Sequence, residues 1–150
     1  MLTARDIMTH DVITVTDETT VKELAQLLSQ HQISGVPVLN DNDELVGVVT
    51  ESDLIFQTKK VHIPTVITIL DSVFYLENPD KMGEEMKKMA GIKVKDILTS
   101  APVTVTEETP LDEIATIMSE KNVHTLPVVV NKITLVGVIG KKDIIRTLID

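Results

Sequence analysis

Apolar and polar positions follow one order along the chain, and that order occurs twice. In the first half, residues 12–15 form a short apolar strand, and the threonines at 19–20 are typical of a helix start. Two apolar runs, 36–39 and 45–49, are separated by polar residues, which predicts a β-hairpin. A second helix is expected after the hairpin. The predicted unit is therefore β-α-β-β-α.

The second half repeats this order. A strand is expected at 103–105, and Thr109 with Pro110 predicts a helix capped by the threonine and beginning at the proline. The apolar runs 126–130 and 133–139 predict another hairpin, with a further helix after it.

The helices are predicted from their starts and from apolar residues spaced by three and four. The second helix of each half begins after a strand, at Glu51 and at Lys141. The first helix of each half carries an apolar stripe with the period of an α-helix. The stripes are Val21, Leu24, Ala25 and Leu28 in the first half, and Leu111, Ile114, Ala115 and Met118 in the second.

The two halves are copies of one unit. Residues 6–56 align with residues 96–146 without a gap, and more than a third of the aligned positions are identical. An internal match of this strength indicates a duplicated supersecondary unit. We therefore predict an α/β fold in which two β-α-β-β-α repeats pack sheet to sheet about a pseudo-twofold axis. Such packing creates two equivalent clefts.

The duplication also predicts the domain organisation. The first repeat is expected at 1–58 and the second at 94–150, with an inserted linker at 59–93. Within the linker, 63–69 is strand-like. Three methionines share one face of a short helix that ends at Gly91: Met82, Met86 and Met89. That face is expected to pack on the core or on a partner subunit, with a ligand lid as the alternative.

Composition narrows the class of protein. Hydrophobic residues make up 43% of the chain but aromatic residues only 2%, so the core is expected to be aliphatic. No apolar run approaches the roughly 18 residues that a membrane span needs, and we expect a cytoplasmic protein with no membrane partner. The net charge of −9 disfavours nucleic acid as a partner, because duplex binding requires a basic face. A small anionic ligand remains compatible with a few local lysines.

The sequence carries no recognisable catalytic motif, so we expect no enzyme activity and no catalytic cofactor. There is no cysteine, no phosphate-binding glycine loop and no nucleophile elbow. The histidines are too scattered to predict a metal site: His10, His31, His62 and His124.

The candidate ligand-binding residues lie where the second strand of each hairpin is followed directly by a helix, at 47–53 and 137–143. Free N–H groups at a helix start favour anions. Thr50 and a carboxylate three residues later, Asp53, can face one cleft, and a carboxylate that accepts two hydrogen bonds suits the cis-diol of a ribose. The alternative is that Thr50, Asp53 and Asp143 only cap their helices. The pattern alone leaves both interpretations open.

Both repeats resemble CBS motifs, and the chain resembles a stand-alone CBS pair, or Bateman module. The resemblance covers about two-thirds of the chain and excludes the linker. It rests on four features that occur in the same order in both halves. They are the Asp-Ile start at Asp6 and Asp96, the Val-x-x-Thr segment before the first helix, a segment that begins with isoleucine in the first repeat (13–16) and with valine in the second (103–106), and the hydrophobic-Pro-Val strand at Pro37 and Pro127. The fourth is Gly-x-x-Thr-x-x-Asp from Gly47 to Asp53, where the second repeat has Gly140 in place of the threonine.

The resemblance implies adenosyl ligands such as AMP, ADP, ATP or S-adenosylmethionine in two clefts between the repeats. In the first cleft, Asp53 would bind the ribose hydroxyls and Thr50 would line the ribose and phosphate side. The base would lie against Val103, Thr104, Thr125 and Pro127, and the phosphates would face His124 and Lys142. In the second cleft, Asp143 would bind the ribose, and the base would lie against Ile13, Thr14, Gly35, Val36 and Pro37. Lys142 could serve either cleft.

The function implied is regulatory. A nucleotide that bridges the repeats would stabilise one relative orientation, which an unidentified regulated protein reads. A homodimer is expected as well. The alternative is a scaffold or dimerisation module with vestigial clefts. A third interpretation, the regulatory insert of IMP dehydrogenase, is disfavoured because no barrel sequence flanks the pair.

Overall fold

The computed structural model describes residues 1–60 and 92–149, with the side chains of 57–60 left out. These residues contain both repeats. The strand-like stretch at 63–69 and the methionine face of the linker lie outside the described residues.

The first half of the chain forms helix α1 (Ala4–Ile7), strand β1 (Val15–Thr16), helix α2 (Val21–His31), strands β2 (Gly35–Leu39) and β3 (Leu45–Thr50), and helix α3 (Glu51–Lys60). Strands β2 and β3 form the predicted hairpin. Strand β1 adds to β2 in parallel.

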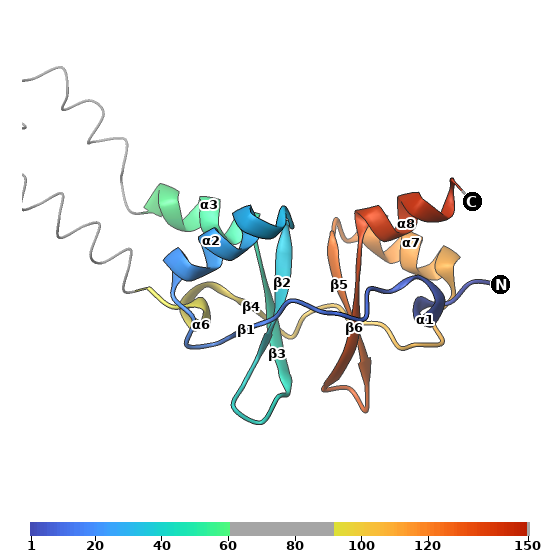
Figure 1. Cartoon of the computed structure of the whole chain (residues 1–150), viewed down its shortest axis with the longest axis horizontal. Coiled ribbons are helices and arrows are strands. Elements are labelled where there is room, and N and C mark those ends of the chain that lie inside the picture. The colour runs from blue at the N-terminus through green and yellow to red at the C-terminus, as the bar shows by residue number, and fades with distance from the viewer. Residues whose placement is uncertain (61–91, 150) are drawn as a thin grey trace, which may run out of the picture.

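The second half repeats the helices and the hairpin, but its first short strand is not the counterpart of β1. Its elements are helix α6 (Val94–Ile97), strand β4 (Thr99–Ser100), helix α7 (Leu111–Glu120), strands β5 (Thr125–Val130) and β6 (Thr134–Gly140), and helix α8 (Lys141–Thr147). The predicted hairpin is β5–β6. The α/β class and the paired repeats are therefore confirmed, and Figure 1 shows the two units side by side, each with its hairpin next to its helices.

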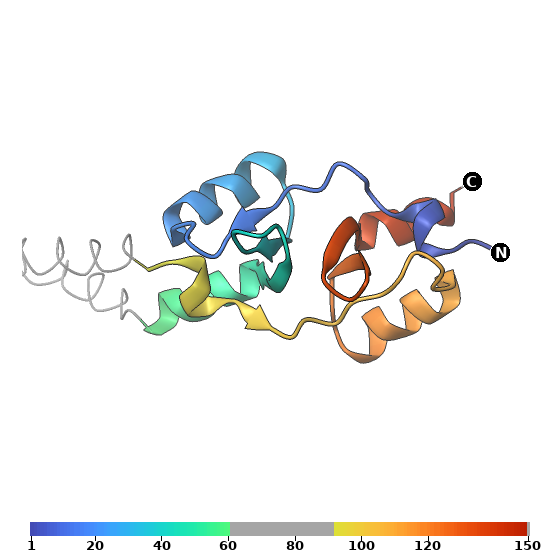
Figure 2. The same cartoon turned by 90° about the horizontal axis from the view of Figure 1, so that it is seen from below.

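The first short helix of each half packs on the other half. Figures 1 and 2 both place α1 beside α7 and α8, and α6 beside α2 and α3. The N–H of Ala4 donates to the carbonyl of Thr109, and the N–H of Val94 donates to that of Thr19. Strand β4 accordingly joins the first sheet, giving the order β1-β2-β3-β4. Two crossing segments, one between α1 and β1 and one between β4 and Val105, therefore run from one packed unit to the other and link them.

Similar ion pairs link α1 and α6 to the half of the chain on which each of them packs. Arg5 of α1 pairs with Glu107 and Glu108, while Lys93 and Lys95 at α6 pair with Glu18. All are surface pairs, so each contributes little on its own to the free energy of unfolding.

Two aliphatic cores lie beneath the helices. Both are built from the predicted stripes together with the alternate residues of the hairpin strands, and each includes the short helix that packs on it. One contains Val15, Leu24, Leu28, Val36, Val38, Val49 and Val94, and the other Ala4, Ile7, Met8, Val105, Ile114, Met118, Leu126, Val128 and Ile139. The packing of α1 and α6 on the opposite half therefore buries apolar side chains that four-residue helices could not bury alone.

The first strand of each repeat is shorter than the sequence predicts. The expected strand at 12–15 is reduced to Val15 and Thr16, and that at 103–105 to one bridge from Val105 to Val128. The remaining residues belong to the crossing segments between the units, which have no strand beside them for most of their length.

The predicted helix starts need one correction. Thr20 caps α2 by accepting from the N–H of Glu23 (3.1 Å). In the second repeat the cap position is Pro110 and not Thr109, because the Thr109 hydroxyl accepts from the N–H of Thr106 (3.1 Å) and stabilises the preceding turn. Proline is tolerated there because its backbone is extended and no N–H is required.

Candidate functional site

A pocket of about 430 Å³ lies between the two repeats. This volume is within the range of roughly 300–1,000 Å³ typical of small-molecule sites. Its walls come from the β3–α3 junction, from strand β4 and the segment after it, and from the start of β5. The lining residues are Ser34, Val48, Thr50, Glu51, Ser52, Thr99, Ala101, Pro102, Val103, Asn122, Val123, His124 and Thr125. Of the residues expected in the first cleft, Thr50, Val103, His124 and Thr125 are therefore brought together.

Thr50 and Asp53 are linked at the β3–α3 junction. Oδ2 of Asp53 accepts from the N–H of Thr50 (2.8 Å) and from its hydroxyl (3.2 Å). Asp53 does not line the pocket itself but holds Thr50, which does. Helix capping is thus present, in agreement with one of the two interpretations of the sequence. Oδ1 of Asp53 accepts no hydrogen bond from the described part of the chain, so it retains capacity for a ligand hydroxyl.

Two residues that line the pocket have a left-handed backbone conformation. Ala101 and Asn122 both have φ of 52°, and both line the pocket. Asparagine adopts this conformation readily, but alanine does so at a cost of order 1 kcal/mol. At Ala101 the chain turns from β4 toward Val103, so the strained residue shapes the wall against which the base is predicted to lie.

The predicted second cleft differs at its central carboxylate. Asp143 is only 6% exposed. Its Oδ2 accepts from the N–H of Gly140 (2.8 Å), and its Oδ1 accepts from the hydroxyl of Thr9 (3.2 Å). Nη1 of Arg146 lies 3.5 Å from Oδ1. Both carboxylate oxygens are therefore engaged within the chain.

The remaining predicted site residues are distributed between core, interface and surface. Val36, Pro37 and Pro127 are fully buried in the hairpins, and Ile13 packs on the first core. Thr104 is half-buried, and Lys142 is exposed on α8 without lining the pocket between the repeats. A Cβ atom on Gly35 would lie 2.7 Å from Oγ1 of Thr125, so Gly35 faces the other repeat and no open space.

Sequence reasoning missed the part of the pocket formed by β4 and the segment after it, Thr99, Ala101 and Pro102. A two-residue strand has no periodicity from which to predict it. Ser34 could have been found, because it precedes β2 as His124 precedes β5.

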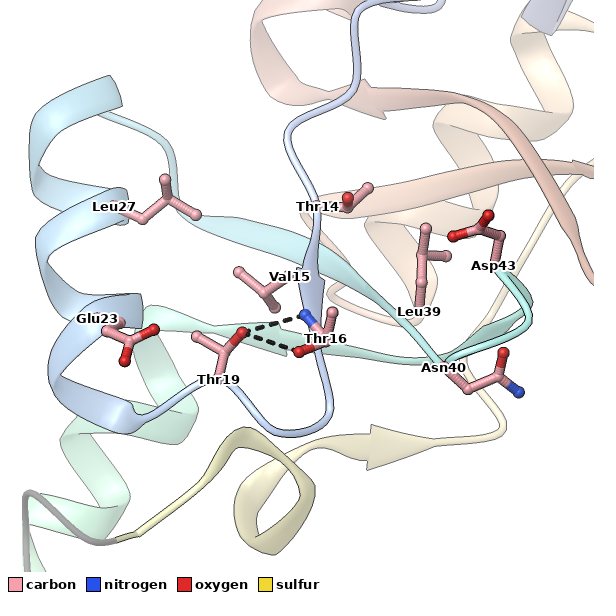
Figure 3. A pocket seen from close by; sticks show the side chains of 9 residues that line it. All are labelled: Thr14, Val15, Thr16, Thr19, Glu23, Leu27, Leu39, Asn40 and Asp43. Atoms are coloured by element: carbon pink, nitrogen blue, oxygen red, sulfur yellow. Dashed lines mark hydrogen bonds between the residues drawn. The ribbon is translucent and has the colours of Figure 1, made fainter.

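A second pocket, of about 330 Å³, lies on the surface of the first repeat (Figure 3). Of the residues predicted for the second cleft, Thr14 lines this pocket. Figure 3 places Glu23 on α2 at one side and Asp43 of the β2–β3 loop at the other. The Thr19 hydroxyl accepts from the N–H of Thr16 (3.1 Å) at its floor.

The described residues contain neither a clustered metal site nor a membrane span. Across 1–60 and 92–149, no three His, Cys, Asp or Glu side chains are grouped as a metal site. Within the same residues, no helix is both long and apolar enough to cross a bilayer.

Comparison with known proteins decides the family. The model of the CBS domain matches residues 4–59 and again residues 94–150, which are the two repeats. The chain belongs to the CBS domain family. It carries the domain twice, as a CBS pair.

Relatives of this CBS pair include a protein of similar length. MJ1426, an uncharacterised protein of Methanocaldococcus jannaschii, is 30% identical over 153 residues, covering 97% of this chain and 90% of the relative. Among solved structures, CBSX2, a CBS-pair protein of Arabidopsis thaliana, was determined in complex with AMP. That structure matches with a TM-score of 0.74 and 26% identity, covering 99% of this chain and 97% of the other.

An enzyme also contains a matching segment. Inosine-5'-monophosphate dehydrogenase of Korarchaeum cryptofilum is 32% identical over 141 residues, which are 94% of this chain but 23% of the enzyme. The similarity is therefore to a part of that enzyme.

Proposed function

We propose that this CBS pair is a regulatory module that binds an adenine nucleotide in the pocket between its repeats. The observation that carries the proposal is the composition of that pocket, to which both repeats contribute: Thr50 from the first, Val103 and His124 from the second. A ligand held there contacts both repeats. The AMP complex of CBSX2, a structural relative at 26% identity, supports an adenosyl ligand.

The pocket offers suitable groups for each part of a nucleotide. Val103 and Pro102 supply an apolar wall for the base. Thr50 lines the pocket, and Asp53, which is bonded to Thr50, has a free Oδ1 that we expect to reach the ribose hydroxyls, which a carboxylate binds by charge-assisted hydrogen bonds. His124 is exposed at the pocket, where it can donate to a phosphate.

The regulatory mechanism is a population shift. The repeats contact one another at β2 and β5 and through the N–H of Leu45, which donates to the carbonyl of Ile133 (2.9 Å). A ligand that contacts Thr50 and Val103 together favours the orientation in which both are within reach. A partner protein that prefers this orientation then binds more tightly when the nucleotide is present, and the coupling is reciprocal.

Titration calorimetry tests the proposal. AMP, ATP and S-adenosylmethionine are titrated into the chain, with GMP as the matched control for the base. We expect a dissociation constant in the micromolar range for an adenosyl ligand, which is about −8 kcal/mol, and weaker binding of GMP. No heat with any adenosyl ligand at millimolar concentration contradicts the proposal and favours the scaffold alternative.

We also propose that two copies associate through the second helices of the repeats. Ile55 on α3 and Ile145 on α8 are equivalent positions, and they are 69% and 55% exposed. Leu148 and Ile149 extend the exposed apolar surface beyond α8. Analytical ultracentrifugation is expected to give a dimer at tens of micromolar and a monomer for Ile55→Glu with Ile145→Glu. A wild-type monomer at that concentration excludes the association.

A further inference from the structure

Asp53 and Asp143 occupy the same position in the two repeats, and each uses one oxygen to cap its helix. Oδ2 of Asp53 accepts from the N–H of Thr50, and Oδ2 of Asp143 accepts from the N–H of Gly140, both at 2.8 Å. The backbone part of the two caps is equivalent, and the first repeat adds the hydroxyl of Thr50, which Gly140 lacks. The two carboxylates also differ at the second oxygen, Oδ1.

The second oxygens have different surroundings. Oδ1 of Asp143 accepts from the hydroxyl of Thr9 at 3.2 Å and lies 3.5 Å from Nη1 of Arg146. Oδ1 of Asp53 has no hydrogen-bond partner within 1–60 and 92–149, and Asp53 is only half-buried. One carboxylate is thus available to a ligand, whereas the other is already satisfied by the protein.

The sequence explains this difference. Arg146 follows Asp143 by three residues, so both lie on one face of α8, and Phe56 holds the equivalent position after Asp53. Thr9 and Thr99 are also equivalent: Thr9 bridges to Val138 as Thr99 pairs with Val48. Only the Thr9 hydroxyl reaches its aspartate among these described residues, while Thr99 lines the pocket between the repeats.

We propose that Thr9 and Arg146 close the Asp143 position to ligands, so that each chain binds one nucleotide, in the pocket at Thr50. The inference rests on the proposed function, because it assigns which carboxylate of the pair takes the ribose. Asp143 then has a structural role. Its bond to Thr9 fastens the crossing segment between α1 and β1 to the second repeat.

The contacts of Asp143 with Thr9 and Arg146 are expected to resist replacement by a ligand for a physical reason. A ribose hydroxyl that replaced Thr9 on Oδ1 would exchange one hydrogen bond for another and would also have to displace the Arg146 guanidinium. The carboxylate is 6% exposed, so any intermediate would leave a buried charge without its partners, which is costly. At Asp53 a ligand hydroxyl replaces water and displaces no protein partner of Oδ1 among the described residues.

The test is the stoichiometry of AMP binding by calorimetry on the whole chain. Wild type is expected to bind one AMP per chain. Asp53→Asn is expected to weaken this binding at least tenfold, and Asp143→Asn to leave the dissociation constant within about twofold while lowering the melting temperature. A stoichiometry of two, or a single site lost in Asp143→Asn and kept in Asp53→Asn, overturns the inference but not the proposed function. No binding by wild type overturns the proposed function itself.

A second variant frees Oδ1 of Asp143 and leaves both aspartates unchanged. Thr9→Val with Arg146→Phe removes both partners of this oxygen. The second substitution gives α8 the residue that α3 has at the equivalent position, Phe56. The Arg146 side chain is 65% exposed, so its replacement is expected to preserve the fold. We expect a second AMP site to appear. A stoichiometry that stays at one, with a native circular dichroism spectrum, overturns the role of Thr9 and Arg146.

Discussion

Gly35 and Thr125 hold the same position in the two repeats, and they lie against each other. A Cβ atom on Gly35 would be 2.7 Å from Oγ1 of Thr125 and 2.9 Å from Cγ2 of Thr50. Because equivalent residues meet there, the pseudo-twofold axis passes between them. The first repeat has a glycine where the second has a threonine, and a side chain on Gly35 would require its neighbours to shift.

Gly35→Ala is expected to destabilise the protein by about 1–3 kcal/mol, since the added methyl group overpacks the contact between the repeats. Urea unfolding measures the loss. Thr125→Ala in the same chain removes the nearest obstructing atom, so the double variant is expected to recover part of the stability. Equal losses in the single and double variants would show that the contact with Thr125 is not the cause.

Asp53→Ala is expected to weaken AMP binding by about 2–3 kcal/mol, which is roughly 30- to 150-fold in the dissociation constant. The matched control is Asp6→Ala. Asp6 caps α1 in the same way, accepting from the N–H of Thr3 (2.9 Å), but Thr3 does not line the pocket, whereas Thr50, the residue that Asp53 holds, does. Both variants lose a helix cap, so both melting temperatures fall, whereas affinity falls only for Asp53→Ala. An unchanged affinity in Asp53→Ala would leave capping as its sole role.

Most of the fold follows from local patterns that the chain states twice. The hairpins were predictable because apolar runs flank polar turns, and α2 because its stripe and its cap at Thr20 agree. The packing of α1 and α6 on the opposite half was not predictable. A four-residue helix has no period to read, and its partner is decided by which core can accept residues such as Ala4 and Val94.

The lining of the pocket between the repeats was predictable in part. Thr50, Val103, His124 and Thr125 meet at one pocket, as the resemblance implies. The Thr9 partner of Asp143 could not be found in this way, because their bond joins residues 134 positions apart, whereas Arg146 lies only three residues after Asp143. Strand β4 was missed for the same reason, since its pairing with β3 depends on the crossing of the chain.

The ion pairs at Glu18 predict a dependence of stability on pH. Hydrogen bonds from Lys93 and Lys95 lower the pKa of Glu18 to about 2, from an ordinary 4.5. Because the pKa is lower in the folded state, the stabilisation is complete above about pH 4.5 and is lost as the pH falls toward about 2.

Unfolding of wild type and Glu18→Gln at neutral pH and in this acid range tests that dependence. Wild type is expected to lose its advantage over Glu18→Gln as the pH falls, and the difference at neutral pH is expected to shrink with salt because the pairs are exposed. A constant difference between the two proteins at all pH values would mean that Glu18 acts through packing.

Lys142 does not line the pocket, but we expect its exposed side chain to reach the phosphates of a bound nucleotide. Lys142→Glu is then expected to weaken binding of ATP more than AMP, and of AMP more than adenosine. The attraction between the lysine and the ligand grows with the number of phosphate charges, and screening reduces it over about 8 Å at physiological ionic strength. Lys141→Glu is the matched control, an exposed neighbour with the same change of charge. Equal losses for all three ligands, or equal effects of the two variants, would contradict a specific role for Lys142.

A crystal structure of the chain grown with AMP would locate the ligand itself. We expect one AMP per chain between the repeats, with its ribose on Oδ1 of Asp53, its base against Val103, and Asp143 still bonded to Thr9. AMP bound at Asp143, AMP in the surface pocket beside Glu23, or no AMP between the repeats at saturating concentration would contradict the proposed site.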